Sequence, residues 1–543
     1  MTFSPRLGQD KVLAATDPVV IVMGGAGTGK TTTAAAVVRR ELDQSHRDRT
    51  PRRRALFLSF SRAAVSQILD RTSGALDRHA AFVEVTTFHA FGWKLVKHFG
   101  SAVGLSEPKL ISPSEAKLFG TTGGITYDEL MPLALRLIAV PAIQRHLQQR
   151  WAIIVCDEFQ DTTRDQFDLI TRIRGEARLL LLGDLNQCIY TNLPGATGVG
   201  PERVAAAESL PGAVRIDLPE VSHRDPTNIL PAAASAVRRR DFDHSAVQAA
   251  LDAGMLSTRH TTDLAAEPKV VADVIVELRA EGHETVAIFS HHVDATADLS
   301  DALNTSGIGH EIVGLPDAVT SALEAQFEML NLAAGGADPE LVLRTLGVFI
   351  TSVERGQAPP RLARMIVGQL AAPDTLITRL DALNEALVVC TSVSDTFEIV
   401  SGAFDRLGLV RGRRPWLTAV RLLRTLLGPR LYRATMLPAD GFGSLREKLT
   451  NQQVDLLTNG AADDPAPVQL MGLYQSKGRE ADATIVVLRE NDYYGRETEP
   501  MPNGSKLLYV VLTRARKKTI ILTFGRQLSP LIRPLAMLGR SGT

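Results

Sequence analysis

Pro18-Val19-Val20-Ile21-Val22-Met23-Gly24-Gly25-Ala26-Gly27-Thr28-Gly29-Lys30-Thr31 is the stretch that decides the fold of this chain. Its first part, up to Met23, is apolar and rich in β-branched residues, which predicts a buried parallel strand. The residues from Thr31 to Arg40 predict a helix. The glycines between them let successive backbone N–H groups converge on phosphate oxygens at the positive end of that helix. The stretch therefore predicts a phosphate-binding loop in an α/β fold.

The pattern G-x-x-x-x-G-K-T also predicts the chemistry of the loop. Lys30 is expected to reach the β- and γ-phosphates of ATP, and the Thr31 hydroxyl is expected to hold Mg²⁺. The alternative, a glycine-rich turn that binds nothing, is disfavoured by the strand before it and the helix after it. The residues expected to contact the nucleotide here are Gly24, Gly25, Ala26, Gly27, Thr28, Gly29, Lys30, Thr31 and Thr32.

Two further apolar runs end in polar residues. Residues 151–156 run directly into Asp157 and Glu158, and residues 177–182 are followed by a segment that ends at Gln187. The carboxyl ends of parallel strands are where an open α/β sheet places its ligand chemistry. Asp157 is expected to hold Mg²⁺ through a water, and Glu158 to orient or deprotonate the attacking water. A solvated acidic turn is the alternative for this pair, and it is disfavoured because the same chain contains a phosphate-binding loop.

With these strands placed, the chain resembles superfamily 1 helicases of the UvrD/Rep/PcrA type, from about residue 3 to about residue 525. The resemblance implies an α/β fold of two RecA-like P-loop domains with parallel sheets, each interrupted by a mostly helical insertion. The ordered segments that carry the resemblance are Leu7–Gln9, Leu58–Ala64, Thr86–Phe91, Asp157–Asp161, Gly183–Tyr190, Ser222–Asp225, Met471–Glu480 and Leu508–Ala515.

The resemblance implies roles for residues outside the loop. Gln9 is expected to read adenine, His223 to stack on it, Arg71 to contact ATP and Glu480 to face the ribose. Arg224 and Arg514 are expected to act as cationic fingers on the γ-phosphate. The implied catalytic residues are Lys30, Asp157, Glu158, Gln187, Arg224 and Arg514. The implied DNA contacts are Phe60, His89, Tyr190 and Tyr474.

Several positions depart from the family pattern. His223 replaces a tyrosine that stacks on adenine, and Tyr474 stands where a histidine is usual. The residues after Tyr190 include no aromatic at the place of a tryptophan that stacks on a DNA base. The catalytic polar groups match, so the departures concentrate on stacking and on the DNA track.

The motifs predict six segments along the chain. Both helical insertions look shorter than those of the family's well-known helicases. The segments are 1–94 and 149–215 for the first RecA-like domain, 95–148 for its insertion, 216–335 and 465–543 for the second domain, and 336–464 for its insertion.

The resemblance implies an ATP-dependent 3′→5′ DNA helicase or translocase that acts in DNA repair, recombination or phage defence. Its expected partners are single-stranded DNA and 3′-tailed duplex DNA. The short insertions and the missing tryptophan keep open a second interpretation, a DNA-stimulated ATPase subunit that works with a partner nuclease. A third, a relative that acts on RNA polymerase, is disfavoured because no long coiled-coil heptad run is evident. Pathway, partner and oligomeric state stay open.

Composition sets the remaining expectations. Lys+Arg and Asp+Glu are balanced at 60 each, which argues against a broad basic surface. The three cysteines, Cys156, Cys188 and Cys390, have no metal-binding spacing. We see no signal-peptide pattern and no apolar stretch near the ~18 residues of a membrane span. A cytoplasmic protein without membrane association is the expectation.

Three arginine-rich clusters lie at 47–54, 238–240 and 411–416. Phosphate contact is the functional interpretation, and a solvated loop is the alternative that we favour for each. The third cluster is the best candidate for nucleic-acid binding, because Trp416 could stack on a base beside its arginines.

Overall fold

The computed structural model of this 543-residue chain describes a defined set of residues. They are residues 5, 8–48, 53–59, 76–121, 124–189, 198–223, 225, 227–290, 293–313, 317–354, 358–432, 436–437, 442, 466–490, 492 and 497–538, with the backbone alone at 77–78, 293–295, 297, 425, 429–431 and 474. The chain forms two compact units. The first is Met1–Leu95, Met131–Gly314 and Asn459–Thr543, and the second is Val96–Leu130 and Leu315–Thr458.

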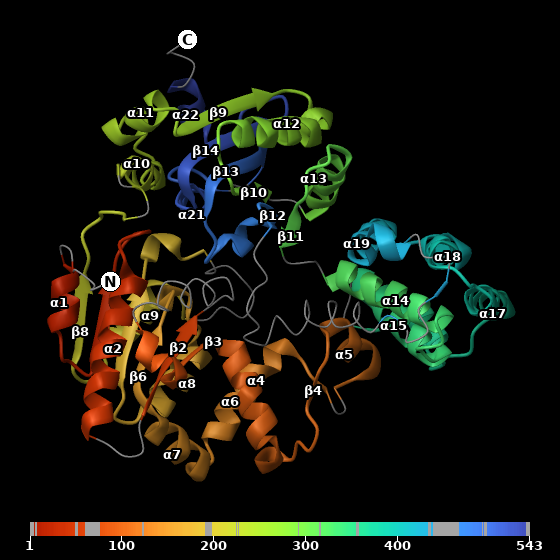
Figure 1. Cartoon of the computed structure of the whole chain (residues 1–543), viewed down its shortest axis with the longest axis horizontal. Helices are drawn as coiled ribbons and strands as arrows, with labels where there is room; N and C mark the ends of the chain where they lie inside the picture. The colour runs from red at the N-terminus through yellow and green to blue at the C-terminus, as the bar shows by residue number, and fades with distance from the viewer. Residues whose placement is uncertain are drawn as a thin grey trace. The chain divides into compact units, whose positions relative to one another are not determined.

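The first unit contains two parallel sheets. One has six strands in the order β3-β2-β6-β7-β1-β8 (Figure 1). Its strands are β1 (Val19–Met23), β2 (Arg54–Ser59), β3 (Val83–Thr87), β6 (Trp151–Cys156), β7 (Arg178–Gly183) and β8 (Ala213–Asp217). Every residue of β1 is buried, because helices cover both faces of a parallel sheet. The strands predicted at 18–23, 151–156 and 177–182 are confirmed as β1, β6 and β7.

Helices complete this α/β layer. α1 (Gln9–Ala14) and α2 (Lys30–Asp48) bury Val12, Val37 and Leu42 against the sheet. The helix predicted at 31–40 is confirmed as the start of α2. The other helices of 10 or more residues near this sheet in the described chain are α4 (Phe88–Phe99), α7 (Pro141–Arg150) and α8 (Arg164–Arg174), and α6 (Leu130–Ile138) and α9 (Pro201–Glu208) are shorter.

The second sheet also has six parallel strands, in the order β11-β12-β10-β13-β14-β9 (Figure 1). Its strands are β9 (Leu256–Thr261), β10 (Val286–Ser290), β11 (Glu311–Val313), β12 (Val468–Gly472), β13 (Ala481–Arg489) and β14 (Ala515–Phe524). One hydrophobic cluster joins it to α10 (Ile229–Arg238), α11 (Ser245–Asp252), α21 (Pro502–Leu512) and α22 (Arg533–Leu538). Another joins it to α12 (Glu267–Ala280) and α13 (Val293–Thr305). The two sheets have the RecA-like α/β fold that the sequence predicts.

The second unit is mainly helical. It contains α14 (Asp317–Ala333), α15 (Pro339–Val353), α16 (Arg361–Ile366), α17 (Asp374–Val388), α18 (Val393–Arg406), α19 (Arg413–Tyr432) and, from the first insertion, the two-stranded β4 (Lys109–Leu110) and β5 (Gly124–Ile125) and the helix α5 (Pro113–Phe119). The six-segment division of the chain stays a prediction. The compact units cut across it, because residues 96–130 pack with the second insertion while α6 and α7 belong to the first unit.

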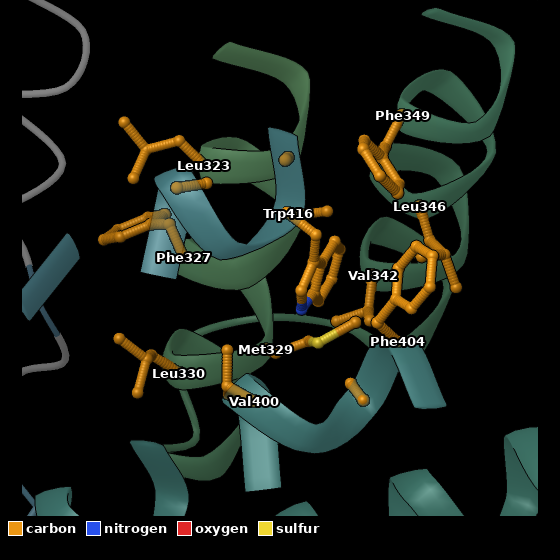
Figure 2. Close-up of a cluster of buried hydrophobic side chains, with 14 of the residues drawn as sticks. Leu323, Phe327, Met329, Leu330, Val342, Leu346, Phe349, Val400, Phe404 and Trp416 are labelled. Carbon is orange, nitrogen blue, oxygen red and sulfur yellow. The ribbon is translucent and has the colours of Figure 1, made fainter. Parts of the chain in front are cut away.

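Trp416 does not form a base-stacking surface, which corrects the interpretation of the third arginine cluster. Its side chain is fully buried in the core of the second unit, among Phe349, Phe404 and Val342 (Figure 2). Trp416 is the fourth residue of α19, and the pattern of that helix turns it inward. The solvated interpretation fits the neighbouring Arg411 and Arg413, which pair with acidic side chains of the same unit.

In the other arginine clusters, Arg53 pairs with Glu176 and Arg240 with Glu499. Residues 461–465, whose sequence Ala-Ala-Asp-Asp-Pro is typical of a linker, lie outside the described residues. Within the described part of the chain, no helix combines the length and the apolar character that crossing a membrane requires.

Candidate functional site

The phosphate-binding loop lies between the end of β1 and the start of α2. Gly27 and Gly29 have φ angles of 77° and 82°, which favour glycine. A Cβ atom at Gly29 would lie 2.5 Å from Gln9 Nε2 and 3.3 Å from His223 Cδ2. A side chain at this position would therefore strain the backbone and displace Gln9. The loop conformation that the sequence predicts is present, and glycine is required in it.

Two segments expected to recognise the base lie against this loop. Gln9 Nε2 donates to the Thr28 carbonyl oxygen over 3.1 Å, and the Gln9 side chain is buried. The backbone N–H of His223 donates to the Gly27 carbonyl oxygen over 2.7 Å, and its side chain is exposed. Residues from the N-terminal segment and from the segment after β8 thus meet at one loop.

Lys30 and Thr31 begin α2 and carry the polar groups of the loop. Lys30 Nζ donates to the carbonyl oxygens of Gly24 and Gly25 over 2.7 and 3.0 Å. The Thr31 hydroxyl donates to Asp157 Oδ2 over 3.3 Å. Hydroxyl and carboxylate oxygens are the ligands that Mg²⁺ prefers, and Mg²⁺ usually takes one or two carboxylates and completes its shell with phosphates and water. Thr31 and Asp157 therefore fit a magnesium site. Thr32 follows them in the first turn of α2.

The two carboxylates after β6 have opposite electrostatics. Burial raises the pKa of Asp157 to about 6, and the neighbouring Glu158 carboxylate acts in the same direction. Burial alone would raise the pKa of Glu158 too, but the charges of Lys477, Arg514 and Lys30 lower it below its ordinary value. Glu158 has a φ of 52°, and its N–H donates to Asp157 Oδ1 over 3.0 Å. The three cations therefore keep Glu158 ionised, which is the form that can accept a proton.

Gln160 connects the carboxylates of Glu158 and Asp161, a role that the sequence did not predict. Its amide nitrogen donates to Glu158 Oε2 over 2.6 Å and to Asp161 Oδ2 over 3.1 Å. Its amide oxygen accepts from the N–H of Asp184 over 2.9 Å, which ties the end of β6 to the end of β7. Gln160 is fully buried. Its place in the D-E-x-Q-D segment was the available signal.

Gln187 and Arg514 meet directly. Asp184 follows β7, and Gln187 ends the short 3₁₀ helix Leu185–Gln187. Gln187 Nε2 donates to Asp184 Oδ2 over 2.9 Å, while Gln187 Oε1 accepts from Arg514 Nη2 over 2.6 Å. Arg514 comes from the second sheet, just after α21, and is buried. Two residues predicted from separate motifs are therefore brought together.

Lys477 and Tyr509 add two contacts between the sheets that the sequence did not assign. Lys477 Nζ pairs with Asp161 Oδ2, and both side chains are buried. Burial raises the pKa of Asp161 to about 6, against the opposing effect of the Lys477 charge. The Tyr509 hydroxyl donates to Asp184 Oδ2 over 3.2 Å. Both residues stand inside motifs that carry the family resemblance, so position was a signal although no role followed from it.

The structure describes His89 and Glu480 among the remaining predicted residues, but not all of the others. His89 lies in the first turn of α4, and burial lowers its pKa to about 4, so its ring is neutral near pH 7. Glu480 is buried, and its carboxylate lies 3.5 Å from Arg516 Nε. Phe60, Arg71, Tyr190 and Arg224 lie outside the described residues, and Tyr474 is described by its backbone alone, in the 3₁₀ helix Leu473–Ser476. Within the described residues, no group of three or more His, Cys, Asp or Glu side chains could hold a metal ion.

Several known proteins resemble parts of this chain. A family model described as an AAA domain matches residues 9–192. The chain is 27% identical over 212 residues to the ATP-dependent DNA helicase UvrD1 of Mycobacterium leprae, a match that covers 36% of this chain and 27% of the relative. It is 32% identical over 122 residues to DNA helicase II of Escherichia coli, covering 22% and 16%. It is 43% identical over 72 residues to the RecBCD enzyme subunit RecB of Mycolicibacterium smegmatis, covering 12% and 7%. The chain thus spans about a quarter of the length of the UvrD1 relative that it matches.

Proposed function

We propose that this chain, which resembles superfamily 1 helicases of the UvrD/Rep/PcrA type, is an ATP-hydrolysing motor that moves 3′→5′ on single-stranded DNA. The observation that carries the proposal is the direct contact of Gln187 with Arg514 over 2.6 Å, beside the phosphate-binding loop. A residue after β7 and an arginine of the other sheet thereby converge near Lys30 and Glu158. This is the arrangement in which binding and loss of a γ-phosphate can move one sheet relative to the other.

We propose a task in hydrolysis for each residue of the site. The loop N–H groups and Lys30 bind the phosphates, and Glu158, held by Gln160 and kept ionised, accepts a proton from the attacking water. Thr31 and Asp157 would hold Mg²⁺, which neutralises charge on the β- and γ-phosphate oxygens when bound. Arg514, with Arg224 as the second proposed finger, leaves its protein partner for the developing charge on the γ-phosphate. An arginine finger accelerates phosphoryl transfer by ~10³–10⁵.

The DNA substrate is proposed from the family resemblance and from two of the relatives, which are named as DNA helicases. His89, Phe60, Tyr190 and Tyr474 are proposed DNA contacts, with single-stranded DNA and 3′-tailed duplexes as substrates. A neutral His89 ring suits contact with bases better than with phosphates, because it carries no charge near pH 7. Work in DNA repair, recombination or phage defence, in the cytoplasm, is part of the same proposal.

ATP turnover with and without single-stranded DNA tests the proposal. The wild-type chain is expected to hydrolyse ATP faster with single-stranded DNA than with blunt duplex. Lys30→Ala should abolish turnover, whereas Glu158→Gln should abolish turnover and retain equilibrium binding of ATP and DNA. Turnover and equilibrium binding should separate in Glu158→Gln, because this substitution removes the proton acceptor and spares the phosphate ligands. Turnover by Glu158→Gln near the wild-type rate would defeat the assignment.

A second function is favoured by one observation. Over 72 residues the chain is 43% identical to a protein that is named as a subunit of the RecBCD enzyme. The alternative is therefore a DNA-stimulated ATPase subunit that works with a partner nuclease and unwinds weakly alone. The tryptophan that is missing after Tyr190 would have stacked on one DNA base, and losing one such stack costs ~1–3 kcal/mol. Breaking one base-pair step of DNA stacking takes about 1.4 kcal/mol, so the loss is comparable to the work of one unwinding step.

Strand displacement by the purified chain decides between the two. Tailed duplexes of increasing length, with a 3′ or a 5′ tail, are the substrates. Efficient displacement of long 3′-tailed duplexes favours the autonomous helicase. ATP turnover on single strands with displacement of short duplexes alone favours the subunit. Preference for a 5′ tail would overturn the proposed polarity in either case.

A further inference from the structure

The Tyr509 hydroxyl touches two elements of the first sheet at once. The residue lies on α21 of the second sheet, with its ring in the hydrophobic cluster of that sheet. Its oxygen accepts from the N–H of Ala26 over 3.4 Å, and its O–H donates to Asp184 Oδ2 over 3.2 Å. Ala26 belongs to the phosphate-binding loop and Asp184 follows β7. One hydroxyl therefore connects the loop with the segment that carries Gln187.

Asp184 decides which end of the Gln187 amide meets Arg514. A carboxylate can only accept hydrogen bonds. It accepts from the Tyr509 hydroxyl, from Gln187 Nε2 over 2.9 Å and, through its other oxygen, from the N–H of Asn186 over 3.0 Å. With the amide nitrogen of Gln187 turned to Asp184, the amide oxygen is turned to Arg514 Nη2. A change at Asp184 would release this orientation.

Near neutral pH the Tyr509 hydroxyl keeps its proton and can donate a hydrogen bond. Burial, together with the Asp184 carboxylate, raises the pKa of Tyr509. Its side chain is only 2% exposed, so water does not compete for its partners. A phenylalanine ring would fill the same space and leave Asp184 with one donor fewer.

We propose that Tyr509 is a positioning residue for ATP turnover, which aligns Gln187 and Arg514 through Asp184 and reports phosphate in the loop to them. The inference rests on the proposed function and deepens it. Phosphate oxygens are charged acceptors and bind N–H groups more strongly than a neutral hydroxyl does. When they fill the loop, the Tyr509 oxygen gives up the Ala26 N–H, and the hydroxyl is then held only by its hydrogen bond to Asp184. Occupancy of the loop thereby reaches the pair that meets the γ-phosphate.

Tyr509→Phe tests this role by a split between kcat and KM. With single-stranded DNA present, kcat is expected to fall about tenfold because the pair is misaligned. The KM for ATP should stay within about twofold, because the phosphate ligands are untouched. Tyr432→Phe in the second unit is the matched control, because the same atom is removed there, and its kcat should equal that of the wild type.

Asp184→Asn provides the second variant. Both substitutions act through one carboxylate, so the double variant is expected to be about as slow as Asp184→Asn alone. Multiplication of the two effects would overturn the proposal, as would an unchanged kcat of Tyr509→Phe or a rise in KM alone. If the wild type itself hydrolyses no ATP, the proposed function fails and takes this inference with it. If the wild type turns over and Tyr509→Phe matches it, the inference alone fails.

Discussion

At the scale of single residues, neighbours set the charges of this site. Asp157 and Glu158 are adjacent and both are partly buried, yet their pKa values shift in opposite directions. Glu158 faces three cationic side chains, two of them from the second sheet, whereas Asp157 faces the charge of Glu158, whose effect outweighs that of Lys30. The chain thus maintains a partly buried carboxylate at Asp157 that costs stability until a cation is bound. Such a cost is common at functional sites.

Asp157→Asn should therefore stabilise the protein in the absence of nucleotide and divalent cations. The pKa of Asp157 rises from its ordinary 3.8 to about 6 on folding. Between these two values the folded state binds more protons than the unfolded state, so stability falls as pH rises and the loss is complete above about pH 6. The rise corresponds to roughly 3 kcal/mol at most.

Thermal unfolding across pH checks this sign. The variant is expected to melt a few degrees above the wild type near neutral pH and to converge with it towards about pH 4. Asp243→Asn, at an exposed position, is the control and should shift nothing. A variant that melts below the wild type near neutral pH would contradict the assignment of strain to Asp157.

At the scale of elements, α5 shows how a segment of one insertion joins another. Its Leu118 lies in the core of the second unit, and Leu118 O accepts from Gln369 Nε2 over 3.1 Å. Ser114 Oγ donates to Asp317 Oδ2 over 2.7 Å, and Arg344 Nη2 pairs with Glu115 over 2.7 Å. The two insertions, far apart in sequence, therefore form one compact body.

Leu118→Ala should loosen this docking. Replacing a buried leucine by alanine typically costs about 2–5 kcal/mol, because a cavity remains. Amide hydrogen exchange is expected to accelerate in α5 and in the facing α15 and α16. Leu417→Ala in α19 is the matched control, since that leucine is 38% exposed and should change exchange little. Unchanged protection of α5 in Leu118→Ala would show that Leu118 does not hold it.

At the scale of the first unit, three residues that belong with the second sheet contact the candidate site. Arg514, Tyr509 and Lys477 each bond a polar residue of the first sheet. Arg514 is the one whose charge would move to the γ-phosphate. Its contribution should therefore belong to the transition state and little to ATP binding.

Arg514→Ala is expected to lower kcat by at least ~10³ with DNA present. The equilibrium Kd for ATP should change less than about tenfold, because the loop keeps its phosphate ligands. Steady-state turnover and fluorescent-nucleotide binding measure the two quantities. Arg526→Ala, at an exposed position of the same sheet, is the control. Normal turnover by Arg514→Ala would exclude a site shared by both sheets.

The local elements of the site could be predicted from the sequence. Buried parallel strands read as apolar runs, so β1, β6 and β7 were placed with the polar residues at their carboxyl ends. The loop was predicted too, because its glycines and Lys30 are adjacent in the chain. These features depend on residues within a few positions of one another.

Only the tertiary structure decided what the long-range partners are. Lys477 meets Asp161 across 316 positions, and Tyr509 meets Asp184 across 325. Trp416 followed an arginine cluster as a DNA-contacting aromatic would, yet the packing of α19 buries it. Local periodicity shows which face of a helix is apolar, but the element that covers that face comes from elsewhere in the chain. Sequence spacing therefore determined the phosphate-binding loop, whereas contacts between distant segments determined its partners.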